Sequence, residues 1–130
     1  MKVLALDFGS ARTGVAVSDP TGTLARPVGV VERAATDAGL AKLVELIRVE
    51  EAERVVVGMP LTLRGEHGEQ ARETAQFVEA LRIRVGVPVE TFDERFTTDL
   101  AEQTPSDASL DARAAAHLLS SYLEWSSARQ

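Results

Sequence analysis

The spacing of apolar residues changes near position 36, and this change constrains the fold more than any other feature of the 130-residue chain. Before that position, three short apolar segments, at 2–6, 13–18 and about 23–31, are separated by tight turns that contain glycine. These segments predict three β-strands that form an antiparallel meander. After it, apolar residues at helical spacing alternate with short β-branched segments, so helices are expected to connect further strands.

The second part of the chain predicts two strands and several helices. Strands are expected over 54–58 and 89–92. A helix is expected over 37–49, with Thr36 or Asp37 as its N-cap. The other expected helices are a segment with Ala71, Thr74, Val78, Leu81 and Val85 on one face, a short helix near Thr98 or Asp99, and a final helix from about Leu110.

The predicted order of elements is β-β-β-α-β-α-β-α. Right-handed crossovers after the third and fourth strands would place the later strands parallel to the first. The expected architecture is therefore α/β, with a mixed five-stranded sheet flanked by helices, which is the outline of the ribonuclease H-like fold. The sequence contains no internal repeat or low-complexity segment, so one domain over 1–130 is expected.

Composition excludes several classes of protein. The chain has no cysteine, which excludes disulfide scaffolds, thiolate zinc sites and cysteine nucleophiles, and its two histidines cannot build an all-histidine metal site. No apolar segment approaches the roughly 20 residues that span a bilayer. Asp7 interrupts the first apolar segment too early for a signal peptide, so a cytoplasmic protein with no membrane partner is expected.

The formal net charge of −6 argues against a protein that binds nucleic acid through bulk electrostatics alone. It does not exclude a nuclease that meets phosphate through divalent metal ions. Three carboxylates fit that chemistry: Asp7 at the end of the first strand, Glu94 just after the last strand and Asp111 at the start of the final helix. Converging acidic oxygens suit Mg²⁺ or Mn²⁺, and two such ions about 3.5–4 Å apart can cleave a phosphodiester.

Each carboxylate also has an ordinary structural explanation. Asp7 lies in an Asp-x-Gly turn, Glu94 could form a surface ion pair with Arg95, and Asp111 suits the first turn of any helix. Only the three together point to a catalytic site. Arg12 and Arg95 are candidates for binding substrate phosphates, because a guanidinium pairs with phosphate in a bidentate manner.

Four segments in order resemble the motifs of the YqgF (RuvX) family, and they extend over nearly the whole chain. They are 4–19 (LALDFGSARTGVAVSD), 57–61 (VGMPL) followed by Gly65 and 68–71 (GEQA), 93–98 (DERFTT), and Asp111 with Ala114 and Ala115. The first and third are specific. The resemblance implies a ribonuclease H-like nuclease, related in fold to Holliday junction resolvases, that matures the 5′ end of precursor 16S ribosomal RNA.

The resemblance also implies a site. It makes Asp7, Glu94 and Asp111 both the metal ligands and the catalytic groups, while Asp93 is expected to point the other way. It implies nucleic acid as partner, with the small ribosomal subunit as a further one, and either a monomer or a homodimer. The sequence departs from the family at 104–109, which carries no positive charge where relatives are often basic, and at Thr62, where they often have asparagine.

Three other functions remain open at this point. The same chemistry could act on branched DNA, which requires two active sites acting symmetrically. The missing basic loop also fits a module that binds nucleic acid without cleaving it. The strand and Asp-x-Gly hairpin further resemble the opening of sugar kinases and actin-like ATPases, but those proteins place a nucleotide between two such domains.

Overall fold

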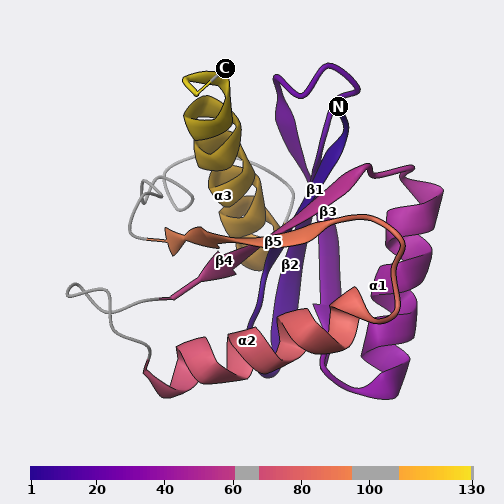
Figure 1. Ribbon diagram of the computed structural model, residues 1–130. Coiled ribbons are helices and arrows are strands. Elements are labelled where there is room, and N and C mark those ends of the chain that lie inside the picture. Colours follow the sequence, from indigo (N-terminus) through magenta and orange to yellow (C-terminus); the bar gives the residue numbers. More distant parts are fainter. Residues whose placement is uncertain (61–67, 95–108, 130) are drawn as a thin grey trace.

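Strand β1 (Val3–Asp7) is paired on both sides and organises the sheet in the computed structural model, which describes residues 1–60, 68–94 and 109–129. It pairs antiparallel with β2 (Arg12–Ser18), which pairs antiparallel with β3 (Ala25–Glu32). On its other side it pairs parallel with β4 (Arg54–Met59), and β4 pairs parallel with β5 (Val89–Asp93). In the described part of the chain the order is β3-β2-β1-β4-β5, so the predicted mixed five-stranded, ribonuclease H-like sheet is confirmed (Figure 1).

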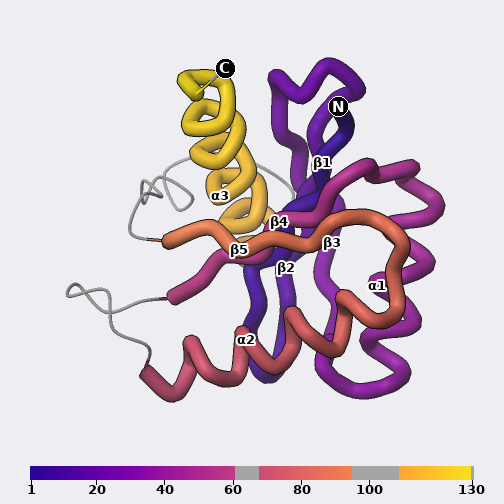
Figure 2. The backbone as a smooth tube through the Cα atoms, in the orientation of Figure 1, coloured from indigo at the N-terminus to yellow at the C-terminus, as the bar shows by residue number. Residues whose placement is uncertain are grey.

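Three helices cover the sheet in the described ranges: α1 (Asp37–Val49), α2 (Glu69–Arg82) and α3 (Leu110–Ser127). The crossovers through α1 and α2 lie on one face, and α3 lies on the other (Figure 2). The expected short helix near Thr98 or Asp99 lies outside the described residues. None of the described helices has the length and apolar character that a membrane span requires.

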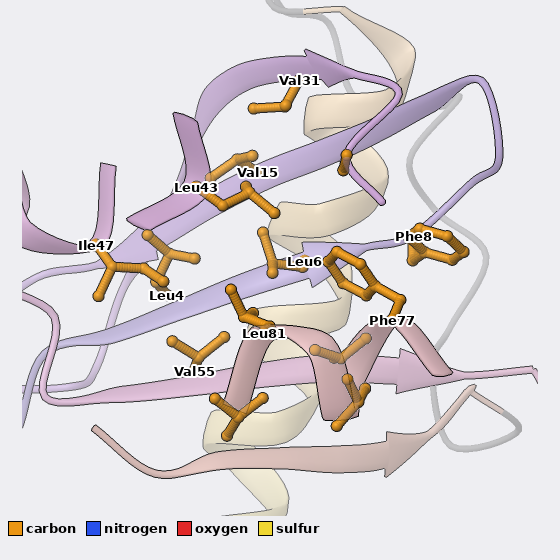
Figure 3. Packing of buried hydrophobic residues seen from close by; sticks show 14 of the residues in the cluster. Leu4, Leu6, Phe8, Val15, Val31, Leu43, Ile47, Val55, Phe77 and Leu81 are labelled. Carbon is orange, nitrogen blue, oxygen red and sulfur yellow. The ribbon is translucent and has the colours of Figure 1, made fainter. Parts of the chain in front are cut away.

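The alternation of side chains along the central strands explains why both faces are covered. Leu4 and Leu6 of β1 and Val55 of β4 pack beneath α1 and α2, in one cluster with Leu81 of α2 (Figure 3). Val3 and Ala5, which alternate with these residues along β1, pack beneath α3 instead. Because successive residues of a strand point to opposite faces, a continuous apolar strand requires cover on both.

Two element boundaries differ from the predictions by more than one residue. The third strand begins at Ala25 instead of about 23, because the Asp19 carboxylate accepts hydrogen bonds from the backbone N–H groups of Thr23 and Leu24 and holds them in a turn. Helix α2 ends at Arg82, with Ile83 as its C-cap, so Val85 lies beyond the helix. Val85 still packs against the same core, which explains why it fits the apolar pattern of the helix.

Parallel strands bring the chemically interesting residues to one edge. Strands β1, β4 and β5 all run in the same direction, and their carboxyl ends are Asp7, Met59 and Asp93. Strand β2 runs in the opposite direction, so its first residue, Arg12, lies at that same edge. Functional groups of open α/β sheets gather beyond the carboxyl ends of their strands.

Thr36, one of the two candidates for the N-cap of α1, is the residue that caps it, and its Oγ1 accepts a hydrogen bond from Gly39 N at 3.1 Å. We expect Thr36→Ala to lower the free energy of unfolding by about 1 kcal/mol, because a backbone N–H loses its acceptor. Urea denaturation measures the change. Thr36→Ser keeps the hydroxyl and serves as the control; an equal loss in both variants would contradict the capping role.

Candidate active site

Asp7 is the last residue of β1 and is half-buried at the edge of the sheet. Its neighbours in the sheet fix its position, because Asp7 lies opposite Gly14 of β2 and follows Leu6, which lies opposite Val57 of β4. The carboxyl group therefore extends from a backbone that is paired with β2 and lies one residue beyond the last pair with β4.

Glu94 follows β5 directly, and a glycine on the neighbouring strand gives its side chain room. A Cβ atom placed on Gly58 of β4 would lie 2.6 Å from Glu94 Oε1 and 3.1 Å from Leu118 Cδ2. Any larger residue at position 58 would thus collide with the carboxyl group. The absent side chain lets Glu94 lie over β4 and form a hydrogen bond with Asp7 on the next strand.

Asp111 lies in the first turn of α3. A second glycine, on β2, lets the start of this helix approach the sheet closely. The N-cap of this helix is Ser109, whose Oγ accepts a hydrogen bond from Ala112 N at 3.2 Å. A Cβ atom on Gly14 would lie 1.9 Å from the backbone carbonyl oxygen of Asp111. Because Gly14 is the partner of Asp7 in the sheet, this contact places the start of α3 beside Asp7.

The electrostatics of the three carboxylates show that they influence one another. Burial raises the pKa of Asp7, the charge of Asp111 raises it further, and the hydrogen bond from Glu94 opposes both. Burial raises the pKa of Glu94 to about 7, with further contributions from the charge of Asp7, their hydrogen bond and the charge of Asp93. Below about pH 7, Glu94 therefore keeps its proton and uses it to donate a hydrogen bond to the Asp7 carboxylate.

Arg12 lies beside the acidic groups, at the start of β2. Its Nε is 3.2 Å from Asp111 Oδ2, and its side chain is 65% exposed. Of the two arginines predicted to bind substrate, Arg12 is therefore at the site, while Arg95 lies outside the described residues. The structure brings together Asp7, Glu94 and Asp111, whose chemical roles remain predictions.

The chemistry of these groups fits a divalent metal ion. All the donors are carboxylate oxygens, which Mg²⁺ and Mn²⁺ prefer. Burial, with a smaller contribution from neighbouring negative charge, raises the pKa values of Asp7 and Glu94, and a cation would offset both effects. Across 1–60, 68–94 and 109–129, no three Asp, Glu or His groups already have an arrangement that could hold one ion. In this arrangement Glu94 is hydrogen-bonded to Asp7, and Arg12 forms an ion pair with Asp111.

The sequence interpretation missed the two glycines that make the site possible. Gly14 and Gly58 stand within two of the family-like segments, and in the structure another group lies against the bare backbone of each. A glycine inside a strand is a known signal of such a close approach. Asp93 was set aside, yet its charge contributes to the raised pKa of Glu94.

Comparisons with known proteins agree in family and fold. A family model described as "RuvX: Holliday junction resolvase" matches residues 1–125. A protein of Chloroflexus aurantiacus named "Putative pre-16S rRNA nuclease" is 38% identical over 131 residues, covering 94% of this chain and 86% of the relative. One of the same name from Desulforudis audaxviator is 39% identical over 132 residues, covering 95% of this chain and 94% of the relative. Among solved structures, RuvC of T. thermophilus in complex with a Holliday junction substrate shares the fold, with a TM-score of 0.62, 19% identity and coverage of 97% of this chain and 96% of that chain.

Replacing Gly14 tests whether the start of α3 depends on a bare backbone. We expect Gly14→Ala to lower the free energy of unfolding by about 3 kcal/mol, because its methyl group would overlap the Asp111 carbonyl and force the helix away. Gly29→Ala on the adjacent strand β3 is the matched control, since nothing lies within 4 Å of a Cβ there. Equal unfolding free energies for the two variants in urea would refute the contact.

Replacing Glu94 tests the shared proton. The pKa of Glu94 is raised in the folded chain, to about 7, so the stability contributed by its protonated form is present at acid pH and lost as the pH rises through 7. We expect metal-free Glu94→Gln to be more stable than the unsubstituted protein at pH 8, by about 1–2 kcal/mol after allowance for solvent screening. The difference should shrink toward pH 5. Urea denaturation across this range measures it.

Glu45→Gln is the control for the loss of one negative charge. Glu45 lies on the exposed side of α1, and its hydrogen bond from Arg48 holds its pKa below the usual range. Glu45→Gln should therefore give no gain in stability at pH 8. A gain equal to that of Glu94→Gln would mean that overall charge, and not the carboxyl pair, sets the pH dependence.

Proposed function

Because the chain belongs to the RuvX family, we propose that it is a nuclease that hydrolyses phosphodiester bonds at Asp7, Glu94 and Asp111. One observation carries this proposal. A hydrogen-bonded carboxyl pair lies at the edge where the parallel strands end, and the charge of a third carboxylate acts on it. A protein gains no stability from burying like charges together, so such a cluster is typical of a functional site.

The proposed substrate is precursor 16S ribosomal RNA, which is the substrate that the names of the relatives state. The cleaved bond would lie in the 5′ leader, and the small ribosomal subunit would be the partner that presents it. A protein with this substrate would act in the cytoplasm. The resemblance of the first and third motifs to those of the family supports the same substrate.

The proposed mechanism assigns a task to each described group. Asp7, Glu94 and Asp111 would hold divalent metal, Mg²⁺ or Mn²⁺, which supplies an activated water and stabilises the leaving oxygen in phosphodiester cleavage. Burial raises the pKa of Glu94 to about 7, so a metal ion that used both carboxylates of the pair would displace the proton that Glu94 holds. Arg12 lies beside Asp111, and from there its guanidinium would bind a phosphate of the substrate.

Asp7→Asn tests the assignment directly. We expect a loss of cleavage on the order of 10²-fold or more, because one essential carboxylate is removed. The amide can still hydrogen-bond to Glu94, so the fold should persist, which circular dichroism checks. The assay follows an end-labelled RNA spanning the 16S leader in Mg²⁺ or Mn²⁺, with a chelator as blank and Glu45→Gln as control. Full activity in Asp7→Asn would refute the proposed site.

Branched DNA is the second candidate substrate, because the matching family model carries the description of a Holliday junction resolvase. A labelled four-way junction belongs in the same assay. Symmetric cleavage of a junction requires two active sites, so light scattering that gives a monomer together with cleavage of RNA alone would exclude it. Metal-dependent binding of RNA without cleavage, in the presence of small ribosomal subunits, would favour a non-catalytic module.

A further inference from the structure

Arg12 and Asp111 are held opposite each other by backbone contacts on both sides. The residue before Arg12 accepts a hydrogen bond at its carbonyl oxygen from Arg33 N, at 2.9 Å. Asp111 is fixed by the close contact of its own carbonyl with Gly14, two residues along β2 from Arg12. The distance of 3.2 Å between Arg12 Nε and Asp111 Oδ2 therefore joins two side chains whose backbones have little freedom to separate.

This ion pair involves a carboxylate that the proposed function requires for metal binding. The oxygen that accepts the guanidinium cannot at the same time be an unshared donor to a cation. The like charges of a guanidinium and a divalent ion also repel each other strongly at short distance. A cation that uses Oδ2 must displace the guanidinium, and a cation that uses Oδ1 binds close to its positive charge, so Arg12 and a metal ion compete at this carboxylate in either case.

We propose that Arg12 is the internal counter-ion of Asp111, and that it competes with divalent cations for this carboxylate. The inference rests on the proposed function, because it needs Asp111 to be a metal ligand. The strength of the pair suits such a role. The Arg12 side chain is 65% exposed, and an exposed ion pair changes an equilibrium constant by only about two- to fivefold. A cation can displace an interaction of this strength.

The test measures Mn²⁺ binding itself, by isothermal titration calorimetry at low ionic strength and pH 8. We expect Arg12→Gln to bind Mn²⁺ about two- to fivefold more tightly than the unsubstituted chain, because the competing cation is gone. Unchanged or weaker binding would overturn the proposal.

Arg26→Gln is a closely matched control. Arg26 is 61% exposed and pairs with Glu50 Oε1 at 3.1 Å, so its replacement removes the same charge and the same kind of ion pair. Glu50 follows α1 and precedes β4, at the opposite edge of the sheet from the carboxyl ends of the parallel strands. Arg26→Gln should leave Mn²⁺ affinity unchanged. An equal increase in both variants would mean that net charge alone sets the affinity.

A double-mutant cycle shows whether Arg12 acts through Asp111 or repels the cation directly. In the Asp111→Asn background, Arg12 has no carboxylate to neutralise, so adding Arg12→Gln should produce no further increase in affinity. A persistent two- to fivefold increase would overturn the counter-ion role and leave simple repulsion.

The same titrations separate this inference from the proposed function. If the unsubstituted chain binds no Mn²⁺ at millimolar concentration and cleaves no substrate, both are refuted. If it binds Mn²⁺ and cleaves RNA while Arg12→Gln binds Mn²⁺ equally well, only the counter-ion role is refuted.

Discussion

The start of α3 lies against bare backbone at Gly14, and the arrangement of the acidic groups depends on this contact. Gly14 is paired with Asp7, so the helix begins beside the one carboxylate that the centre of the sheet fixes. Gly58 has the corresponding role one strand beyond β1 on the other side, where it leaves space for Glu94. Two missing side chains on the strands that flank β1 thus determine where two of the three carboxylates can lie.

This arrangement has an electrostatic cost that the fold does not remove. Burial and mutual repulsion disfavour the ionised forms of Asp7 and Glu94, and a shared proton offsets part of that cost. Asp111 instead forms an ion pair with Arg12. Each of the three acids thus has a partner at the site: Asp7 and Glu94 share a hydrogen bond, and Asp111 pairs with a guanidinium.

The strands of the sheet could be predicted from the sequence because each depends on the residues of its own short segment. The apolar segments 3–6 and 55–57 have no polar face, and only a strand covered on both sides tolerates that. The placement of Asp7 follows from the end of the first segment. The end of α2 was missed because Val85 packs on the core from beyond the helix, and an apolar pattern cannot separate these two cases.

The finer features of the site depend on contacts between distant parts of the chain. The spacing of residues along the sequence does not reveal such contacts. The pKa of Glu94 depends on the register that sets Gly58 beside it, and Arg12 lies at Asp111 because α3 packs on β2. Each residue was visible in the sequence, but its partner was not.

The charge of the chain gives this local chemistry a wider consequence. A net charge of −6 disfavours contact with a nucleic acid backbone, and three clustered carboxylates add to that repulsion locally. Under the proposed function, divalent cations at these carboxylates would reverse the sign of the charge there. Affinity for a phosphate backbone and cleavage of that backbone would then depend on the same ions.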